Sequence, residues 1–524
     1  MSVKNLVFVL TCHQCYIRHG EDEKRYAAEN NLFFSSISNT YLPLLRMLHR
    51  LVAAEKRFKL SFVISPTLCA LLSDTLVQQQ YVAWLDRHIL LGRQEIARCA
   101  GGDCYAAAQR CLERYLQDKK DFTETYGQNL LRGFARFAKK GFIELLATAG
   151  TYAFLPHYAD MTEVLNAQVE TGLCSHRYFF GSKPDGFWLP ALGYAPGVEK
   201  VLRAYGLHYT FVDTHAVLFP KVAATDGIFS PVRCQNSLVL FARDRETPAD
   251  FFGENGFSHN SVYSDQNKDI GFELPSSELG EFVQAGEVRL ATGFRYWAKS
   301  SSVYDAEAAA QQVRADAKAF VAAKLSKLTA ASELLNGKEV TLVCTIPADE
   351  LTTHWAEGVA FLEAVIDEVC ATEALTLTSG ASLLSQQFSL QKLTPYPSAA
   401  TGSGYGEDLL DNTNGWMLRY TRKMCERMID ISGRFPNETG LKVRLLNLGA
   451  KELMLAQSSE WAKMLHEGQL QDYVTERFKA SIQAFITVFD SLGSNTVSTE
   501  WLTRLEREHP LFPWMNFRIF SRKK

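Results

Sequence analysis

Short apolar runs that alternate with helical segments constrain the fold of this chain more than any other feature. Residues 3–10 (VKNLVFVL) form one such run and 60–65 form a second, with helical spacing over 40–51 between them. Runs of this length without polar alternation are typical of strands buried on both faces. The pattern predicts parallel strands joined by crossover helices.

The same alternation returns after a purely helical stretch. From about 70 to 140 the sequence carries only long amphipathic helical patterns, which indicate a helical insertion after the second strand. Further strand-like runs follow at 142–148, 186–189, 209–213, 237–241, 288–291 and 340–346. Together these segments predict an α/β fold built as a barrel or a distorted relative of one.

The length of the chain sets the expected number of domains. With 524 residues it exceeds what one ordinary core contains, so two or three domains are expected. An Ala-rich stretch over 305–335 predicts one long helix. We expect a discontinuous barrel over 1–70 and 140–375, a helical insertion over 71–139, a Ser-, Thr- and Gly-rich linker or loop over 376–414, and a C-terminal helical domain over 415–524.

Composition narrows the classes of partner. Hydrophobic residues make up 47% and charged residues 22% of the chain, and the formal net charge is −3 without a long block of like charge. This argues against nucleic acid or an anionic membrane as a partner. No stretch reaches the roughly 18 apolar residues of a membrane helix, and the first apolar run is too short for a signal peptide. The eleven cysteines lie in apolar segments, as buried free thiols do. We therefore expect a cytoplasmic protein.

The residues that follow the strand-like runs are the candidate site, because α/β barrels place their active sites at the C-terminal ends of the strands. These segments are 11–16 (TCHQCY), 151–152, 188–191, 213–215, 347–350 and 354–355. Aromatic faces cover the apolar faces of a sugar, and polar side chains bond its hydroxyls. A single Trp or His is more often a core residue, so the repetition is what predicts a cleft for a polar ligand.

Five regions of the sequence resemble, in order, those by which glycoside hydrolase family 57 is recognised. They are 12–19 (CHQCYIRH), 141–156 (GFIELLATAGTYAFLP), 186–202 (GFWLPALGYAPGVEKVL), 347–362 (PADELTTHWAEGVAFL) and 451–465 (KELMLAQSSEWAKML). The end of the chain, HPLFPWMNFRIFSRKK, is similar to the closing pattern of the branching-enzyme branch of that family. The resemblance spans nearly the whole chain.

The resemblance implies a fold and a reaction. The fold is a distorted (β/α)7 barrel with a helical insertion and a C-terminal all-helical domain. The reaction is that of a 1,4-alpha-glucan branching enzyme, which needs no metal and no cofactor. One carboxylate attacks the anomeric carbon of an α-1,4-glucan or maltooligosaccharide, and a second protonates the leaving oxygen. The cut chain is then joined through an α-1,6 link, as in glycogen.

Both positions that carry the catalytic carboxylates in this family are alanine. The family nucleophile is the Glu of a Trp-Leu-Pro-Glu pattern, which here reads Trp188-Leu189-Pro190-Ala191. The acid/base is the Asp that opens Asp-x-Glu-Leu-x-x-His-Trp, and this position is Ala348. A methyl group neither attacks carbon nor carries a proton, so the family route to glycosyl transfer is closed.

Four further departures accompany the two alanines. The family residues His, Pro, His and Asp are replaced by Thr11, Cys15, Tyr152 and Glu460. These scattered changes favour drift after the loss of catalysis over a designed double substitution. We therefore predict a non-catalytic α-glucan-binding protein. Its cleft residues are expected to be His13, Trp188, Asp213, His215, His354, Trp355, Trp416, Gln457 and Trp461.

Two alternatives remain open from the sequence. The chain could be an active branching enzyme or glucanotransferase that uses displaced carboxylates, or a structural or regulatory partner that binds no sugar. Asp349 lies one residue beyond the acid/base position, and on an extended segment its side chain points to the opposite face. It is expected to serve only if the loop changes register, and Asp213 and Glu350 lie in the same neighbourhood.

A Cys12-x-x-Cys15 pair lies in the first of the five regions. Zinc sites need two further ligands at matching spacing, and a redox pair needs a lowered thiol pKa. The sequence supplies neither signal, so two ordinary thiols are expected.

Overall fold

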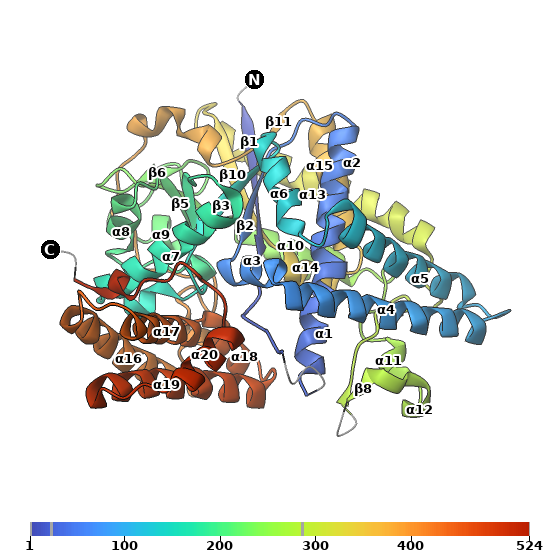
Figure 1. Ribbon diagram of the computed structural model, residues 1–524. Helices are drawn as coiled ribbons and strands as arrows, with labels where there is room; N and C mark the ends of the chain where they lie inside the picture. Colours follow the sequence, from blue (N-terminus) through green and yellow to red (C-terminus); the bar gives the residue numbers. More distant parts are fainter. Residues whose placement is uncertain (1–2, 21–24, 285–287, 523–524) are drawn as a thin grey trace.

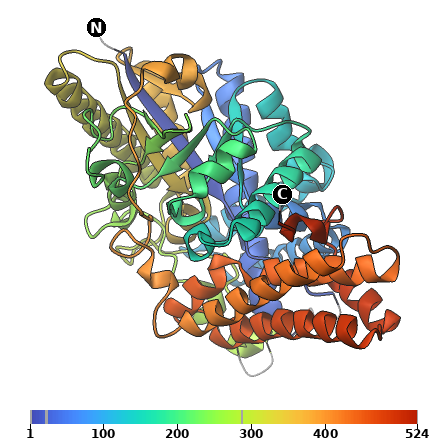
Figure 2. The ribbon, with the colours of Figure 1, turned by 90° about the vertical axis from the view of Figure 1, so that its left-hand side faces the viewer.

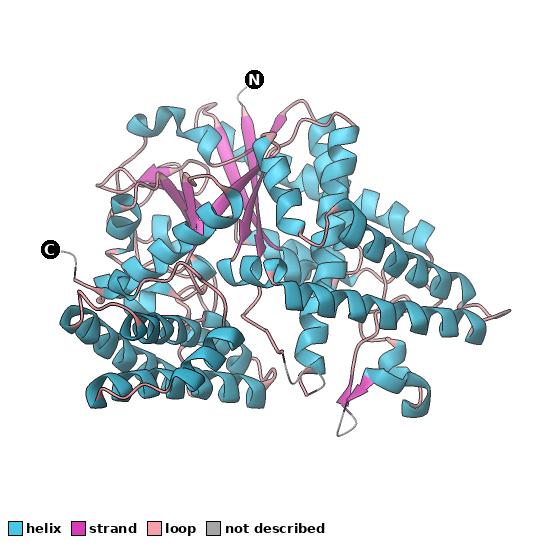
Figure 3. Ribbon diagram, in the orientation of Figure 1, coloured by secondary structure: helices cyan, strands magenta, loops and turns pink. Residues whose placement is uncertain are grey.

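Eleven strands and the helices around them are seen in the computed structural model, which describes residues 3–20, 25–284 and 288–522 (Figure 1). Figure 3 shows most of the strands gathered at the centre of the upper part of the molecule, with helices on both sides, and a separate short hairpin at the lower right. The strands are β1 (Lys4–Cys12), β2 (Leu60–Ile64), β3 (Ile143–Thr148), β4 (Gly186–Trp188), β5 (Tyr209–Val212), β6 (Val232–Arg233), β7 (Val239–Ala242), β8 (Val283–Gln284), β9 (Val288–Arg289), β10 (Val340–Pro347) and β11 (Leu375–Thr378).

Seven parallel strands form the barrel, in the order β10-β1-β2-β3-β4-β5-β7. The two outer strands of this series meet again through a parallel bridge between Arg243 and Val343, where the Asp244 N–H donates to the Val343 carbonyl at 2.7 Å. The sheet therefore curls into the distorted (β/α)7 barrel that the family resemblance implies. Strand β6 runs antiparallel to β7, and β11 pairs in parallel with the first half of β1.

Strand β1 shows why the sheet is apolar on both faces. Successive side chains of a strand point to opposite sides. Val7 and Val9 join an interior cluster with the ring of Phe211, whereas Leu6 and Phe8 belong to the outer cluster that the helices cover. All four β1 side chains are fully buried, which explains the unbroken apolar run in the sequence.

The helices before β3 include the two long ones that project from the barrel in Figure 1, α4 and α5. They are packed together through aromatic residues such as Trp84 and Tyr115, whose ring centroids are 5.7 Å apart. The Asp74 carboxylate begins α4 by accepting the N–H groups of Leu76 and Val77. These helices are α1 (Ala27–Ser36), η1 (Ile37–Tyr41), α2 (Leu42–Ala53), α3 (Pro66–Ser73), α4 (Thr75–Arg98), α5 (Tyr105–Lys120), η2 (Asp121–Thr125) and α6 (Leu130–Lys139).

The second half of the barrel carries its own helices and short turns. They are η3 (Leu155–Tyr158), α7 (Thr162–Phe180), η4 (Pro190–Leu192), α8 (Val198–Ala204), α9 (His215–Leu218), α10 (Glu246–Phe252), η5 (Phe257–His259), α11 (Ile270–Glu273), α12 (Ser276–Leu279), η6 (Gly280–Phe282), α13 (Ala306–Leu334), α14 (Ala348–His354), α15 (Gly358–Ala371), η7 (Ala381–Ser389) and η8 (Glu407–Leu409). The long Ala-rich helix that the sequence predicts over 305–335 is α13.

The C-terminal helices pack on the side of the barrel toward which β1 runs, as Figures 1 and 2 show from two directions. Hydrogen bonds join the two parts, because the Thr151 hydroxyl donates to the Met454 carbonyl at 2.6 Å and the Ser459 hydroxyl donates to the Tyr152 carbonyl at 2.7 Å. These helices are α16 (Gly415–Arg434), α17 (Leu441–Ala456), α18 (Ser459–His466), α19 (Gln471–Ser494), α20 (Thr499–Glu508) and η9 (Phe517–Phe520). None of the helices described is long and apolar enough to cross a membrane.

One strand-like run of the sequence does not belong to the barrel. Residues 288–291 supply β9, which pairs only with β8 in a two-stranded antiparallel hairpin. The run is short and places the charged Arg289 next to Val288, and it lacks the continuous burial of a barrel strand. Strands β6, β8 and β11 were not foreseen. β6 and β8 have only two residues each, and β11 overlaps the segment for which the sequence predicts a linker or loop.

Candidate functional site

A cavity of about 410 Å³ opens at the carboxyl ends of the barrel strands, beside α18. Its volume falls within the range of pockets that hold small ligands. Residues that follow β1, β3, β4, β7 and β10 all reach it, as a barrel site requires. Its walls include Thr11, His13, Tyr152, Trp188, Ala191, Leu192, Arg243, Thr345, Asp349, Glu350, Ala400, Thr401, Glu460 and Lys463. We refer to it as the cleft.

Ala191 lines the cleft from a strained turn. Both Ala191 and Leu192 have left-handed backbone angles, with φ of 50° and 49°. Such angles cost a non-glycine residue about 1 kcal/mol or more. The turn is held by the Leu192 N–H on the Leu189 carbonyl and by the Ala400 N–H on the Ala191 carbonyl at 2.6 Å. The turn therefore persists although the side chain at position 191 is only a methyl group.

Ala348 is placed differently from Ala191. It is the first residue of α14, only 1% of it is exposed, and it packs in the outer core. Its neighbours Pro347 and Asp349 line the cleft, whereas Ala348 does not.

Asp349 lies at the cleft, contrary to the expectation that its side chain would point to the opposite face. The expectation assumed an extended segment, but Ala348–His354 is helical, and one residue along a helix turns the side chain by about 100° rather than 180°. The carboxyl accepts the Tyr41 hydroxyl at 2.6 Å and the His13 backbone N–H at 3.0 Å. Burial raises the pKa of Asp349 to about 7, although these two hydrogen bonds oppose the shift.

His13 forms one wall of the cleft together with Tyr152. The two rings are stacked, with centroids 3.9 Å apart and planes inclined by 13°. Burial, helped by the nearby Lys463 ammonium, lowers the pKa of His13 to about 3, so the imidazole is neutral near neutral pH. Its Nε2 lies 3.5 Å from Glu460, and with a neutral ring this contact is polar rather than an ion pair. Burial also raises the pKa of Glu460.

Trp188 reaches the cleft at the end of β4. Its indole N–H donates to the Tyr152 hydroxyl at 3.0 Å, and 5% of the residue is exposed. Tyr152 thereby fixes the Trp188 ring. The edge of the indole thus has its polar atom satisfied within the protein.

Asp213 does not line the cleft itself but holds Arg243, which does. The carboxylate is fully buried and accepts the Arg243 Nε at 2.7 Å and the His215 backbone N–H at 3.1 Å. Arg243 lines the cleft and donates a second hydrogen bond to the Ala400 carbonyl at 3.0 Å. His215 itself lies beyond this pair, away from the cleft lining.

His354 and Trp355 are not brought to the cleft. Trp355 is fully buried between Tyr263 and Phe361, with ring centroids at 5.2 and 4.7 Å. His354 is exposed at the end of α14 and its ring centroid is 6.0 Å from that of Phe252. Position along the sequence did not predict that Trp355 faces the core or that His354 faces solvent. A residue at the end of a helix can face the core as readily as the site.

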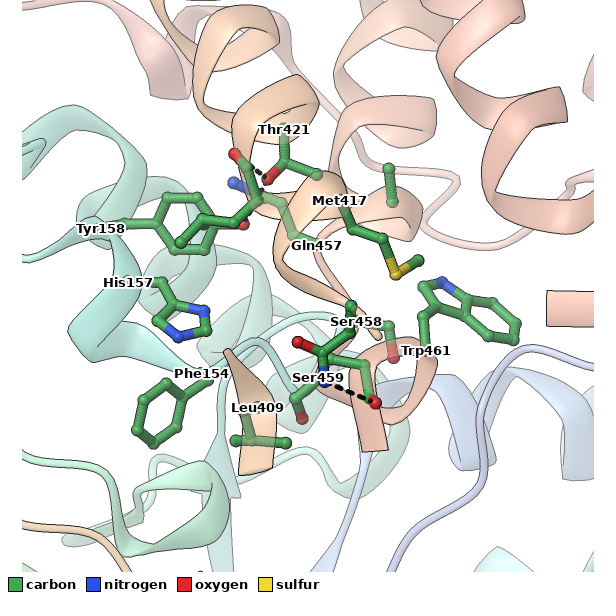
Figure 4. Close-up of a pocket in the computed structure, with 14 residues that line it drawn as sticks. Phe154, His157, Tyr158, Leu409, Met417, Thr421, Gln457, Ser458, Ser459 and Trp461 are labelled. Carbon is green, nitrogen blue, oxygen red and sulfur yellow. Dashed lines mark hydrogen bonds between the residues drawn. The ribbon is translucent and has the colours of Figure 1, made fainter. Parts of the chain in front are cut away.

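Gln457 and Trp461 line a separate small cavity next to the cleft, which Figure 4 shows in close-up. Its volume of about 30 Å³ has room for one water. Gln457 accepts a hydrogen bond from Gln168 at 2.9 Å, and the Trp461 indole donates to the Leu455 carbonyl at 2.8 Å. Trp416 lines neither cavity and packs edge-on against Phe478 with centroids 5.2 Å apart.

Two charged residues of the cleft were missed in the sequence. Arg243 follows the run at 237–241, and Lys463 stands three residues after Glu460 on α18. Both could have been predicted as cleft residues. Arg243 follows a strand, and Lys463 lies within the family-like region 451–465. Cations at these positions are less typical of a sugar site than aromatic residues and carboxylates, so the sequence alone did not single them out.

The thiols near the cleft have no metal-like arrangement. Within the part of the chain that the structure describes, no three His, Cys, Asp or Glu residues are grouped to hold a metal ion. Cys12 and Cys15 are buried free thiols. Burial raises the pKa of both, in the case of Cys15 to about 12. A thiol of this kind is a poor nucleophile and a poor redox partner.

Comparison with models of known protein families shows which family the chain belongs to. The model of glycosyl hydrolase family 57 matches residues 7–313, which is more than half of the 524 residues. The chain belongs to glycosyl hydrolase family 57. A second model, described as the C-terminal part of 1,4-alpha-glucan branching enzyme, matches residues 420–520. This family 57 protein is therefore of the branching-enzyme type.

Individual relatives agree with this assignment. The 1,4-alpha-glucan branching enzyme TK1436 of Thermococcus kodakarensis is 23% identical, over 97% of this chain and 77% of its own length. The crystal structure of the alpha-amylase AmyC from Thermotoga maritima has a TM-score of 0.92 with 28% identity, and all of both chains is covered. The family 57 branching enzyme from Pyrococcus horikoshii has a TM-score of 0.87 with 20% identity over 99% and 97% of the two chains, which shows the common fold.

Proposed function

We propose that this family 57 protein binds α-1,4-glucan or maltooligosaccharide in the cleft without cutting it. The observation that carries the proposal is the state of the two catalytic positions. Ala191 presents a methyl group to the cleft where the family has its nucleophile, and Ala348 is buried in the core. A retaining glycosidase needs two carboxyl groups about 5–5.5 Å apart across the scissile bond. Neither position supplies one.

The remaining walls of the cleft suit a sugar. The stacked rings of His13 and Tyr152 offer an aromatic wall, and Trp188 adds a second aromatic edge. Arg243 and Lys463 can donate hydrogen bonds to hydroxyl groups. The neutral His13 ring has one donor and one acceptor nitrogen, and neither has a hydrogen-bond partner among the described residues. Aromatic faces combined with a few polar groups are the usual means of holding a pyranose ring.

A second candidate function is favoured by Asp349. A carboxyl group with a pKa of about 7 that lines the cleft can hold or release a proton near neutral pH, which suits a general acid or base. Glu460, whose pKa burial also raises, lies in the same cleft. These two groups would be the displaced carboxylates of an active glucanotransferase. The first candidate is preferred because no carboxylate replaces the nucleophile at position 191.

Binding and turnover can be measured separately. Affinity electrophoresis in gels that contain amylose should retard the wild-type protein, and Trp188→Ala should abolish most of the retardation while Trp188→Phe retains part of it. Phe388→Ala, at an exposed ring that does not line the cleft, serves as the control. A wild-type protein that migrates alike with and without amylose would support the third possibility, a structural or regulatory partner that binds no sugar. The cytoplasmic location and the absence of nucleic-acid and membrane partners stay predictions.

A further inference from the structure

Three aromatic side chains are exposed together on the surface around His215. Phe219 is 51% exposed, Tyr396 41% and Tyr405 49%. Leu218 and Val222 are also exposed and adjoin Phe219 in the chain. Exposed apolar surface of this extent on one face commonly marks a binding site. We call Phe219, Tyr396, Tyr405 and His215 the aromatic platform.

The rings of the aromatic platform are continuous. His215 is stacked on Phe219 with centroids 4.6 Å apart and planes inclined by 24°, and it lies 5.4 Å from Tyr405 at 31°. Tyr396 is 6.2 Å from Phe219 and 6.5 Å from Tyr405. Four rings therefore cover one contiguous area rather than isolated points.

The backbone beneath the aromatic platform is held in place. The Tyr396 N–H donates to the Ala216 carbonyl at 3.0 Å, and Ser398 exchanges two backbone hydrogen bonds with Tyr194 at 2.8 and 3.1 Å. Gly404 has a φ of 121°, and a Cβ at this position would lie 2.2 Å from the His215 ring. The glycine lets the backbone pass directly against that ring. A surface fixed in this way loses little conformational entropy when it binds.

The aromatic platform is linked to the cleft by a chain segment and a buried carboxylate that both surfaces share. The segment between Tyr396 and Tyr405 includes Ala400, which lines the cleft and donates its N–H to the Ala191 carbonyl. On the other side, Asp213 accepts from both Arg243 in the cleft and the backbone of His215. The same segment and the same buried carboxylate thus join the two surfaces.

The chemistry of the aromatic platform suits a carbohydrate chain. Its ring faces are apolar, and within the described residues the hydroxyl groups of Tyr396 and Tyr405 have no hydrogen-bond partner, so each can bond a ligand. The Arg245 guanidinium contacts the His215 Nε2 at 2.6 Å and adds a donor at the edge. A ligand with apolar faces and hydroxyl edges complements this surface.

We propose that the aromatic platform binds a further stretch of the α-1,4-glucan chain whose end or middle lies in the cleft. This rests on the proposed function, because the cleft must hold sugar for its extension to matter. Each additional sugar ring that reaches the aromatic platform stacks on a side chain. Affinity therefore rises with chain length beyond the units that the cleft alone holds.

The test is a series of maltooligosaccharides from maltose to maltoheptaose, with dissociation constants measured by calorimetry. We expect wild-type affinity to rise across the series. The double variant Phe219→Ala/Tyr405→Ala should lose about tenfold for maltoheptaose and stay unchanged for the shortest ligand that binds, because two stacking partners are gone. Phe219→Tyr/Tyr405→Phe keeps both rings but moves one hydroxyl group, and it should retain most of the wild-type affinity. Tyr178→Ala, 63% exposed on α7, is the matched control for exposure.

Each other outcome has a distinct meaning. Equal losses of affinity for short and long ligands, or no effect of the double variant, would contradict glucan binding by the aromatic platform and leave the proposed function intact. No binding at any length would overturn the proposed function itself. A wild-type dimer that the double variant converts to a monomer, with unchanged glucan affinity, would show that the aromatic platform is a protein interface instead. Melting temperatures of all variants are compared, since exposed rings should contribute little to stability.

Discussion

At the residue scale, two features of the cleft are typical of functional sites. The strained turn at Ala191 persists, and a buried carboxyl with an unusual pKa stands at Asp349. Strain and shifted pKa values gather at functional sites because the surrounding structure enforces them. Both residues can therefore be probed by substitution.

Asp349→Asn should change the pH dependence of stability. The folded carboxyl, with a pKa of about 7, binds its proton more tightly than the unfolded one, whose ordinary value is 3.8. Wild-type stability therefore falls as the pH rises between these values, by about 2 kcal/mol from pH 5 to 7.5. The asparagine can still accept the His13 N–H and donate to Tyr41, so it should remove this part of the slope and leave the variant relatively more stable at pH 7.5.

Urea unfolding at several pH values measures that slope. Glu254→Gln, at an exposed carboxylate, is the control and should keep the wild-type profile. If Asp349→Asn retains the full decline between pH 5 and 7.5, the carboxyl does not titrate where the structure indicates.

Ala191→Gly should stabilise the protein, by up to about 1 kcal/mol. Glycine adopts the left-handed angles of this turn without the penalty that alanine meets, although its greater freedom in the unfolded chain offsets part of the gain. Ala310→Gly, on the exposed face of α13, should instead destabilise by about 1 kcal/mol. Thermal unfolding of the two variants should therefore shift in opposite directions, and a loss of stability in both would mean that the turn at 191 is not strained.

At the scale of elements, long and uniform patterns were predicted well and short ones were not. The apolar runs that became β1, β2, β3, β5, β7 and β10 are fully or nearly fully buried, so sequence pattern and burial agree. The sequence predicts an extended segment after β10, but α14 begins there at once, and this turns Asp349 toward the cleft. Trp355 follows a strand closely enough to be predicted as a cleft residue, but it is buried in the core. Spacing along the chain does not determine the direction of a side chain. The domain boundaries stay our proposal.

Asp74 connects the start of α4 to Arg18, which follows β1. Its substitution tests how much this connection stabilises the protein. Its carboxylate begins α4 and also accepts the Arg18 Nε at 2.8 Å. Asp74→Ala removes the cap and leaves Arg18 with its backbone acceptors alone, so we expect a loss of about 2 kcal/mol. Asp86→Ala, at an exposed carboxylate on the same helix, should lower the free energy of unfolding by only a few tenths of a kcal/mol. Chemical denaturation compares the two, and equal losses would contradict the special role of Asp74.

At the scale of the whole molecule, the chain is a family 57 protein of the branching-enzyme type, and we propose that it lacks the catalytic pair. Restoring Ala191→Glu and Ala348→Asp together should not recover branching, because Ala348 is 1% exposed and its replacement would be a buried carboxyl in the outer core. Tyr152 also occupies more of the cleft than the family His, and misplacement by about 1 Å can cost a hundredfold in rate. Weak hydrolysis is the most that the double variant should show. Robust branching by it would mean that the rest of the site never decayed.

The central claim, that the cleft holds glucan but transfers none, is tested most directly by incubation of the wild-type protein with amylose. The α-1,6 links and the reducing ends are both counted over time and at several protein concentrations. We predict that neither rises above the protein-free background, because no nucleophile replaces the family glutamate at position 191. A rise in α-1,6 links in proportion to protein, abolished by Asp349→Asn, would contradict the account and assign the chain to the active enzymes.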